Sequence, residues 1–524
     1  MRLARSARTA AALAVLSASF AASTLSAQGL PRDMTAWVAR TLKTFQVPGM
    51  GVAVVKDGKV VLAQGYGVRT LGEPTPADAN TLFQIASNSK AFTTASLAML
   101  VDQGRLHWDD KVTEYLPWFQ LSDPYVTREL TVRDLVTHRS GLGLGAGDLL
   151  WLGSTYTRDQ VLHRIRYARV ASSFRSKFAY DNVLYAAAGE VIRAITDSSW
   201  SQYVTAHILR PLDMTGATTD ITAVPAGADL ASPHGVVHGT LQVVPRDTVS
   251  SIAPAGAIVA SVNDMAKWMI VQLDSGRVGE HRLWSAARTR DMWSGNTILP
   301  IGNAPPELPA YHMDFAEYGL GWFLYDYRGH KMVTHTGGLA GMTSRVMLFP
   351  AQKLGIVVLT NGESPAFDAV ALHIADGYLG FTPTDWIGGF AALQQKAHER
   401  AAQVEANAST SRDSASGPSL PLQKYAGRYR DKMYGDATIA LVNGTLVLSF
   451  SHSPDFTGPL EHWQYDTFKT HWRTATIPNA YVTFALNPDG SIATMTMQAV
   501  SPLADFSYDY QDLEFHPVTD AAGK

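Results

Sequence analysis

The stretch Ser87-Asn88-Ser89-Lys90 decides how the rest of this 524-residue chain is interpreted. From Asn88 to Gln103 the sequence is apolar almost all round, and it stops at Gly104, the residue that most readily takes the left-handed conformation after a helix. The pattern predicts a buried helix. Because a spacing of three residues stacks two side chains on one helix face, we expect Lys90 to reach the Ser87 hydroxyl.

This pairing is one way to make a serine nucleophilic. A serine hydroxyl attacks poorly near neutral pH unless a partner takes its proton, and burial of a lysine destabilises the ammonium form so that it can serve as that base. Backbone N–H groups at a helix start also face an oxyanion formed at Ser87. The alternative is that Ser87 only caps the helix, although a capping box carries Glu or Gln at the fourth position rather than Lys.

A second candidate is Tyr180-Asp181-Asn182, which precedes an apolar helical stretch from Val183 to Ile192. A phenol can relay a proton between serine and leaving group, and an Asn amide can hold a substrate carbonyl. The alternative is a tyrosine packed at a helix start with Asn as the cap. The motif alone does not decide between the two.

A third candidate is His335-Thr336-Gly337-Gly338, placed just before a strand that begins near Arg345. Paired glycines let a substrate lie against a strand edge, and the Gly338 N–H is a candidate oxyanion donor. The alternative is a glycine turn with an incidental histidine.

The three motifs each occur once, in this order, and together they resemble the penicillin-recognising serine hydrolases. The resemblance is to the branch that contains class C β-lactamases, DD-peptidases and related esterases and D-amino-acid peptidases. It extends over about Met34 to Gly362 and includes Thr131 to Leu142 and Ala255 to Ala266. The segment that opens with Tyr425-Ala426-Gly427-Arg428-Tyr429 is similar to the lipocalin-like barrel appended to some peptidases of this branch.

The resemblance implies a role for each motif residue. Ser87 would attack an ester or amide carbonyl to give an acyl-enzyme, and Lys90 and Tyr180 would share the proton transfers. The oxyanion would lie between the N–H groups of Ser87 and Gly338. Asn182, His335 and Gly337 would contact the substrate.

One position departs from the β-lactamase pattern. The third motif of β-lactamases begins with Lys, which helps to bind a substrate carboxylate, whereas this chain has His335. A neutral imidazole is a weaker anchor for an anion. We therefore expect hydrolysis of short acyl esters, peptides or D-amino-acid amides. The alternatives are a β-lactamase or DD-carboxypeptidase, or a non-catalytic scaffold that binds cell-wall peptide.

Turn signals predict the fold around these motifs. Residues 51–55 and 60–64 form one expected hairpin, and residues 345–349 and 356–360 another. Strands at both ends of this region, with helices between them, suggest an antiparallel sheet whose first and last strands meet. The resemblance implies an α+β fold, in which helices flank that sheet beside an all-helical subdomain.

The C-terminal region differs in composition. Residues 391–407 are polar and Ala-rich, as in a helix, and residues 409–419 have linker composition. Hairpins are expected at 438–450, around Asn443-Gly444, and at 481–497, so the last hundred residues are expected to form a small β barrel. The expected organisation is a hydrolase domain over 28–387, a helical and Ser-rich linker over 388–420, and a barrel over 421–517.

The N-terminus has the order of a secretory signal. Arg2, Arg5 and Arg8 precede an uncharged, small-residue run to about Leu25, and cleavage is expected after Ala27. The expected location is secreted or periplasmic, and no later segment reaches the roughly 20 apolar residues of a membrane span.

Composition narrows the chemistry and the partners. Zero Cys excludes disulfides, thiolate metal sites and a cysteine nucleophile. The net charge of −3, without a long basic run, argues against nucleic acid, and neither a cofactor nor a metal is expected, since the pair His234 and His238 has no obvious third ligand. A small-molecule or peptide substrate is expected, and the β domain is a candidate surface for homo-oligomer formation.

Overall fold

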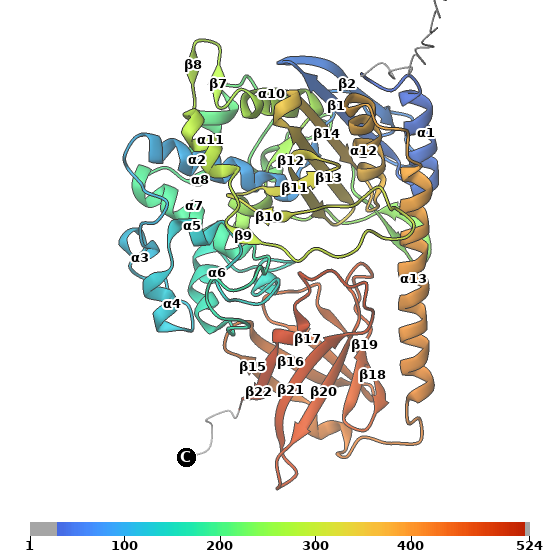
Figure 1. The fold of residues 1–524 in the computed structure, drawn as a ribbon. Helices are drawn as coiled ribbons and strands as arrows, with labels where there is room; N and C mark the ends of the chain where they lie inside the picture. The colour runs from blue at the N-terminus through green and yellow to red at the C-terminus, as the bar shows by residue number, and fades with distance from the viewer. Residues whose placement is uncertain (1–28, 519–524) are drawn as a thin grey trace, which may run out of the picture.

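The structure is a computed structural model that describes residues 29–518, so the expected signal segment lies outside the described residues. Eight antiparallel strands form the main sheet, which occupies the upper part of the molecule in Figure 1. Across the sheet the strands are β2 (Lys59–Gly67), β1 (Gly49–Lys56), β14 (Leu354–Thr360), β13 (Met342–Phe349), β12 (His330–Leu339), β11 (Phe323–Tyr327), β10 (Ala316–Tyr318) and β9 (Thr297–Ile298).

The first and last strands of the hydrolase domain, β1 and β14, pair with each other beside the edge strand β2, as the sequence predicts. Val52 of β1 lies opposite Val358 of β14, and the two predicted hairpins, β1–β2 and β13–β14, are confirmed. Val52 and Val54 face one hydrophobic core, whereas Ala53 and Val55 face the other. Because successive side chains of a strand point to opposite faces, β1 is buried on both sides.

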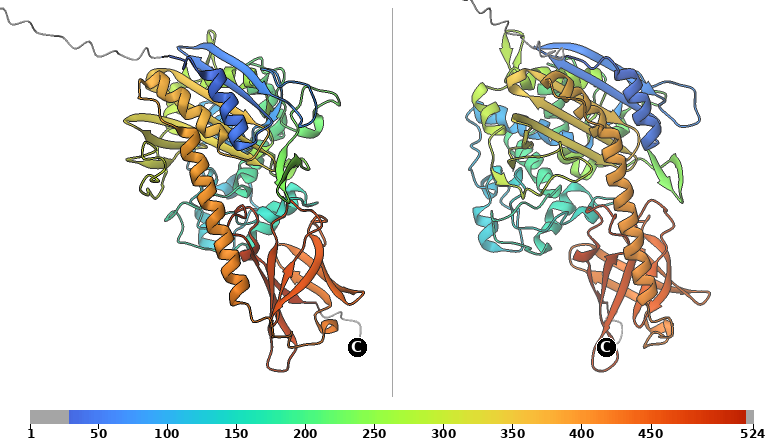
Figure 2. Two further views of the ribbon diagram at one scale, coloured as in Figure 1. Left: turned by 90° about the vertical axis from the view of Figure 1, so that its right-hand side faces the viewer. Right: turned by 45° about the vertical axis from the view of Figure 1, so that its right-hand side comes forward.

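Helices cover both faces of the sheet. Figure 2 shows α1 (Met34–Phe45), α12 (Ala366–Leu379) and the start of α13 (Trp386–Ser411) on one face. On the other face α10 (Val262–Leu273) packs against β1 and β14, and beyond it lies α2 (Lys90–Asp102).

The helical region beside the sheet is built from short elements around α2 and α7. Its helices are α3 (Val112–Tyr115), α4 (Pro124–Glu129), α5 (Val132–Leu135), α6 (Arg158–Arg164), α7 (Val183–Thr196), α8 (Trp200–Val204), α9 (Ala253–Gly256) and α11 (Ala286–Met292). Three two-stranded ribbons accompany them: β3 (Phe83–Gln84) with β6 (Val259–Ala260), β4 (His234–Val237) with β5 (Thr240–Val243), and β7 (Arg277–Val278) with β8 (His281–Arg282). The architecture is therefore the expected antiparallel sheet with flanking helices.

The C-terminal region forms a closed antiparallel barrel of eight strands, which lies below the sheet in Figure 1. The strands are β15 (Gly427–Asp431), β16 (Gly435–Val442), β17 (Thr445–Phe450), β18 (Thr457–Gln464), β19 (Thr467–Thr470), β20 (Ala480–Leu486), β21 (Ile492–Ala499) and β22 (Glu514–Pro517). Both predicted hairpins are present as β16–β17 and β20–β21. Asn443 and Gly444 both have positive φ, at 49° and 82°, as a tight turn between twisted strands requires.

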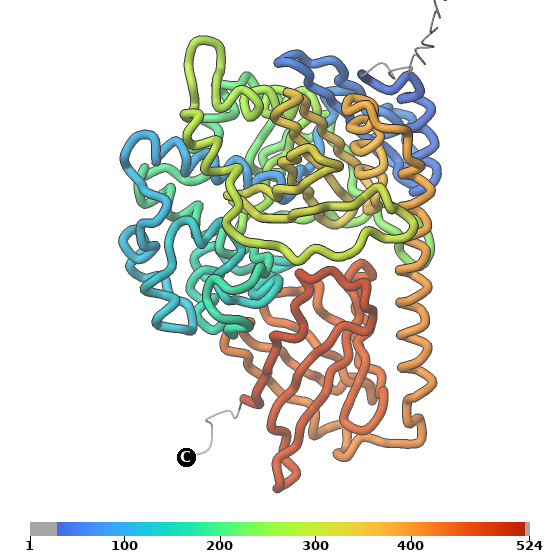
Figure 3. Tube along the Cα trace, viewed as in Figure 1, coloured from blue at the N-terminus to red at the C-terminus, as the bar shows by residue number. Residues whose placement is uncertain are grey.

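The segment between the sheet and the barrel is mostly one 26-residue helix, α13, which contains the predicted helical stretch 391–407. The tube in Figure 3 shows the helix running down beside the barrel before the chain turns back into it. The Ser-rich stretch after α13 is bonded to the barrel: Arg412 donates to the His462 carbonyl at 3.0 Å, and the Asp413 N–H donates to the Gln464 side chain at 2.9 Å.

Candidate active site

The Ser87 turn forms where the β3–β6 ribbon ends. The Ile85 N–H donates to the Ile258 carbonyl at 2.9 Å, and the chain then enters a 3₁₀ turn, η1 (Ala86–Ser89), that leads into α2. Ala86 has a φ of +48°, a conformation that typically costs about 1–3 kcal/mol and that the surrounding contacts must hold. Ser87 lies inside η1 and does not cap α2, because Ser89 occupies the position before that helix.

Lys90 is fully buried and has three acceptors around its amine. Nζ lies 3.0 Å from Ser87 Oγ, 2.7 Å from Asn182 Oδ1 and 3.1 Å from the Ala255 carbonyl. Burial lowers the pKa of Lys90 to about 7, against the opposing effect of the Asp148 and Asp181 charges. A neutral amine has two hydrogens and one lone pair. If Asn182 and Ala255 take the hydrogens, the lone pair points at the Ser87 hydroxyl.

Tyr180 covers the other side of this pair. Lys90 Nζ lies 4.7 Å from the centroid of its ring. Burial raises the pKa of Tyr180, and a hydrogen bond with Ser87 acts in the opposite direction. The phenol therefore keeps its proton near neutral pH and stands next to the serine as a proton donor.

Asn182 is free for this network because its neighbour takes over the capping of α7. The Leu184 N–H donates to Asp181 Oδ1 at 3.1 Å, and Asn182 makes no capping bond. The Asn182 amide instead accepts from Lys90 and donates from Nδ2 to Asp148 Oδ2 at 2.9 Å. Asn182 therefore occupies the position before α7, as the alternative expected, but its side chain does not cap the helix.

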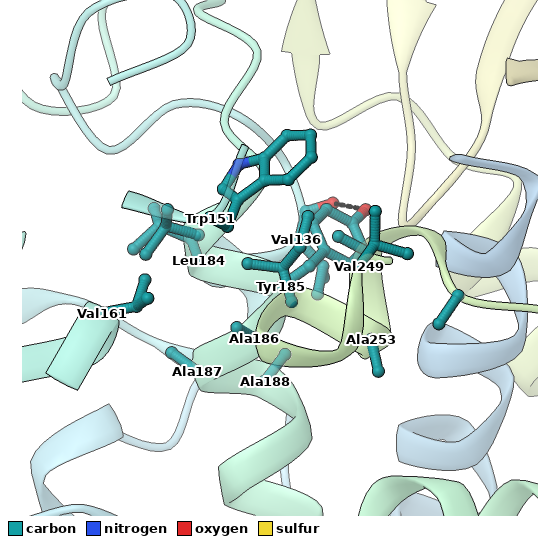
Figure 4. Close-up of a cluster of buried hydrophobic side chains, with 14 of the residues drawn as sticks. Val136, Trp151, Val161, Leu184, Tyr185, Ala186, Ala187, Ala188, Val249 and Ala253 are labelled. Atoms are coloured by element: carbon teal, nitrogen blue, oxygen red, sulfur yellow. Dashed lines mark hydrogen bonds between the residues drawn. The ribbon is translucent and has the colours of Figure 1, made fainter. Parts of the chain in front are cut away.

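Under the site, α7 contributes an apolar face to the core, and Figure 4 shows Trp151, Leu184, Tyr185 and Val249 within this cluster. The Tyr185 hydroxyl donates to the Val136 carbonyl at 2.9 Å, which the dashed line marks. The same hydroxyl lies 3.2 Å from that of Tyr318, which contacts His335 Nε2 at 3.2 Å. A chain of buried hydroxyls therefore connects α7 to strand β12.

His335 is held as a neutral imidazole. Its Nδ1 donates to the Thr336 carbonyl at 2.6 Å, which leaves Nε2 to accept from Tyr318. Burial lowers the pKa of His335 to about 3, and the charge of Lys90 acts in the same direction. This side chain supplies no positive charge to the site.

The two glycines of the third motif have different surroundings. A Cβ at Gly337 would collide with the Ile85 carbonyl oxygen, so the missing side chain lets β12 pack directly against the Ser87 turn. Gly338 is exposed, has open space where a Cβ would lie and lines the cleft beside Ser87. The structure therefore places Gly338 at the cleft, whereas Gly337 faces the turn behind it.

A family model described as Beta-lactamase matches residues 34–379. The chain belongs to the β-lactamase family of serine hydrolases. A second model, a domain of unknown function (DUF3471), matches residues 411–517, which include all eight barrel strands.

Several named proteins resemble this β-lactamase-family hydrolase. "Unguisins hydrolase ungD" of Aspergillus violaceofuscus is 29% identical over 79% of this chain and 77% of its own, and "Protein flp" of Staphylococcus aureus is 26% identical over 64% of each. The octameric penicillin-binding protein homologue from Pyrococcus abyssi has a TM-score of 0.60 at 21% identity and covers 89% of this chain and 98% of its own. SurE has a TM-score of 0.52 at 18% identity, with 93% and 98% covered.

The cleft of this hydrolase encloses about 310 Å³ and brings together five of the predicted residues, Ser87, Tyr180, Asn182, His335 and Gly338. Lys90 lies beneath them. The wall also includes a loop of the barrel, Asp505, Phe506 and Ser507, with the Phe506 ring edge-on to Tyr180 at 5.7 Å between centroids. Its larger apolar lining residues are Trp151, Phe178, Val249, Ile252, Phe323, Leu339 and Phe506.

The sequence motifs did not reveal Asp148, Phe506 and Ser507. Ser507 Oγ donates to Asp148 Oδ2 at 2.8 Å, although 359 positions separate the two residues. Asp148 is fully buried, and burial raises its pKa to about 7, whereas hydrogen bonds from Trp151, Ser507 and Asn182 oppose the rise. The only local signal is the turn composition of Gly145-Ala146-Gly147 before the aspartate.

His234, one of the two histidines weighed above as metal ligands, has a structural role. His234 Nε2 accepts from the Leu71 N–H at 3.0 Å, and Nδ1 lies 2.9 Å from the Asn361 carbonyl. His238 lies in the turn of the β4–β5 ribbon, with a φ of +50°. Within residues 29–518, no group of three or more His, Cys, Asp or Glu is placed to hold a metal ion.

Proposed function

We propose that this hydrolase cleaves a short acyl ester, a peptide or a D-amino-acid amide through an acyl-enzyme on Ser87. Ser87 Oγ attacks the carbonyl carbon while Lys90 Nζ takes the hydroxyl proton. The resulting oxyanion accepts from the backbone N–H groups of Ser87 and Gly338. The proton passes to the leaving group through Tyr180, the bond to that group breaks, and water then releases the acid by the same steps in reverse.

The proposed choice of substrate rests on the charges of the residues that line the cleft. No Lys or Arg occurs among the described residues that line it, and its histidine is neutral. A β-lactam or a D-Ala-terminated peptide carries a carboxylate, which would enter this apolar wall without a cationic partner. Arg345, the cation that follows on β13, is buried and paired with Asp368. The surroundings therefore disfavour a substrate that places a carboxylate in the cleft.

A second cavity of about 440 Å³ shares Trp151, Gly338, Asp505 and Ser507 with the cleft and adds two carboxylates, Asp247 and Glu363. Burial raises the pKa of Glu363, and the charges of Asp247 and Asp505 act in the same direction. Such surroundings repel an anionic substrate and tolerate an amine. They support an amino-acid amide or a peptide over a β-lactam.

The names of two relatives are consistent with an amide substrate. One is called a hydrolase of unguisins, and a structure of SurE contains D-Leu. We accordingly place peptides and D-amino-acid amides beside short acyl esters as the substrates to test.

The test compares p-nitrophenyl acetate and butyrate, D- and L-amino-acid p-nitroanilides, and nitrocefin, with Ser87→Ala as the control. We expect ester or anilide turnover that exceeds nitrocefin turnover and disappears in Ser87→Ala. A fluorophosphonate should add one label, at Ser87. If nitrocefin were the best substrate, the role assigned to the cleft lining would be wrong. Equal labelling of the native protein and Ser87→Ala, or no labelling, would refute the acyl-enzyme and favour a binding scaffold.

We also propose that residues 1–27 direct export to the periplasm or the medium and are then removed. The support is the order of Arg2, Arg5 and Arg8, the uncharged run and Ala27. Cell fractionation and the intact mass test this, and a cytoplasmic protein that retains Met1 would contradict it. Within residues 29–518, no helix combines the length and hydropathy of a membrane span.

Homo-oligomer formation through the barrel is a further proposal. It rests on the octameric state named for the Pyrococcus abyssi homologue and on the closed barrel at one end of this chain. Light scattering on the full chain and on a chain that ends before residue 412 tests it. If the two proteins formed particles with the same number of protomers, the barrel would have no role in the assembly.

A further inference from the structure

Side chains from a loop of the barrel form hydrogen bonds with one turn of the hydrolase body, both with the backbone of that turn and with one of its side chains. That turn is η2 (Asp148–Leu150). The Asp509 carboxylate accepts from the Gly147 N–H at 2.9 Å and from the Leu149 N–H at 3.2 Å, and Tyr434 donates to the same carboxylate. Two residues earlier, Ser507 Oγ donates to Asp148 Oδ2. Asp509 thus already anchors the loop, and the Ser507 bond adds a contact with one buried carboxylate.

Asp148 connects this contact to the lysine beside Ser87. Its Oδ1 accepts from Trp151 Nε1 at 2.7 Å, and its Oδ2 accepts from Asn182 Nδ2 as well as from Ser507. An ionised carboxylate only accepts hydrogen bonds, so it requires Asn182 to present Nδ2. The amide then turns Oδ1 toward Lys90 Nζ, at 2.7 Å.

We propose that Ser507 of the barrel is a positioning residue for Lys90 that acts through Asp148 and Asn182, so that the barrel completes the catalytic site. The proposal rests on the function assigned above to Lys90 as the base. Ser507 touches neither Ser87 nor Lys90. The hydrogen bond from its hydroxyl favours the ionised form of Asp148, which only accepts hydrogen bonds. Asp148 in turn keeps the Asn182 amide in the orientation that accepts a hydrogen bond from the Lys90 amine.

The charges around the amine give the sign of the effect. Lys90 is influenced by Asp148 on η2, Asp181 before α7, His138 after α5, His335 on β12, and the rings of Tyr180 and Tyr185. Asp148 in turn interacts with Asp509 of the barrel, Asp181, Tyr180 and Lys90.

Loss of the Ser507 hydroxyl removes a hydrogen bond that lowers the pKa of Asp148. More of this carboxyl is then protonated near pH 7, and Lys90 loses negative charge that favours its ammonium form. The pKa of Lys90 consequently falls, and the acid limb of the rate profile moves to lower pH. The maximal rate falls at the same time, because a protonated Asp148 no longer fixes the Asn182 amide.

The experiment measures kcat/KM and kcat against pH for the full chain, Ser507→Ala and Asp148→Asn, with the best ester of the panel. Ser507→Ala should lower kcat about tenfold and move the acid midpoint down by about half a pH unit. Asp148→Asn should shift the midpoint in the same direction by more, since the charge is gone. Ser507→Thr, which keeps a hydroxyl, should restore the native midpoint.

Ser453→Ala is the matched control. Ser453 is also a buried serine of the barrel, 7% exposed compared with 8% for Ser507, and it lies among Phe450, Phe456 and Leu149 away from the cleft. We expect its kcat and midpoint to equal those of the native protein, whatever its melting temperature. A merely structural role of Ser507 would likewise change the melting temperature without moving the midpoint.

Failure of this proposal differs from failure of the proposed function. If the native protein does not react with a fluorophosphonate, the acyl-enzyme mechanism itself is wrong. If the native protein reacts but Ser507→Ala and Asp148→Asn keep its acid midpoint and kcat, Ser507 does not position Lys90. Should Ser507→Ala not fold, the Asp148→Asn midpoint decides: an unchanged or higher value overturns the proposal.

Discussion

The interior beside Ser87 and the interior of the barrel are both closely packed, but they bury different groups. Around Ser87 the body buries Lys90, Asp148 and Asp181, and burial moves the pKa of each to between about 7 and 8. The barrel buries a stack of aromatic and aliphatic side chains that includes Phe468, Phe484, Leu448, Val482, Met495 and Phe515.

The end of the barrel that meets the hydrolase body differs from the middle of the barrel. The cavity where it meets the body holds about 10 Å³, roughly one water molecule, and Leu149 of the body lies in its wall. Asp509, a buried carboxylate at this end of the barrel, accepts a hydrogen bond from the Tyr434 hydroxyl. The comparison indicates that the middle of the barrel provides stability, whereas the loop at its rim contributes to the cleft.

The largest effect should come from removing the nucleophile. Ser87→Ala should lower kcat by about 10⁴–10⁶-fold, because loss of the nucleophile in serine hydrolases removes the covalent route. Ser96→Ala is the control, since Ser96 is a buried serine of α2, the helix that follows the Ser87 turn, and its hydroxyl only donates to the Phe92 carbonyl. Turnover by Ser87→Ala above about a hundredth of the native rate would show that another group carries out the reaction.

Replacing a large side chain inside the barrel by Ala should lower the stability of the protein without changing catalysis. Phe484 is 3% exposed and packs against Tyr425, Tyr429 and Phe468, so Phe484→Ala should cost about 3–5 kcal/mol in the free energy of unfolding. At a temperature where the variant is folded, kcat should equal the native value. Thr483→Ala, an exposed neighbour on β20, is the control for both measurements. A fall in kcat for folded Phe484→Ala would contradict the division between the middle and the rim.

The pH profile should follow the buried charges of the body. The base must be neutral to accept a proton, and the pKa of Lys90 is lowered to about 7. Below pH 7 we expect kcat/KM to fall about tenfold per pH unit, with a plateau above it. The pKa of Asp148 lies in the same range, so the midpoint belongs to the pair. A flat profile from pH 5 to 8 would be incompatible with Lys90 as the base.

The smallest effect is expected at the rim of the barrel. Phe506 is 38% exposed and forms part of the cleft wall against Tyr180. Phe506→Ala should change kcat/KM about three- to tenfold, more for butyrate than for acetate esters, and change the free energy of unfolding by about 1 kcal/mol at most. Val442→Ala, on an exposed barrel hairpin, should change neither quantity. Identical acyl preferences of Phe506→Ala and the native protein would exclude the rim from substrate selection.

The local patterns predicted the elements that depend on local physics. Asn443-Gly444 supplied the positive φ angles of a tight turn, and the apolar run after Lys90 identified a buried helix. The Ser87–Lys90 contact follows from a spacing of three within one continuous turn and helix. Such features could be inferred because neighbouring residues determine them.

Other parts of the site depend on distant chain segments. Asp181 and Asn182 are both good caps, and only the position of Lys90 and Asp148 in the folded chain decides which of them leaves the helix. Gly337 and Gly338 are equivalent in sequence, but the Ser87 turn lies against one and the cleft against the other.

The sequence by itself supplied the candidate reacting groups: one Ser-x-x-Lys pair, a tyrosine, an Asn and a histidine in place of lysine, in a chain without cysteine. Only the tertiary structure decided their electrostatics and their partners. The pKa of Lys90 depends on burial and on two carboxylates from other elements, and the Ser507–Asp148 bond joins residues that are 359 positions apart. Desolvation and long-range hydrogen bonds arise from the packed fold, so no local pattern of residues encodes them.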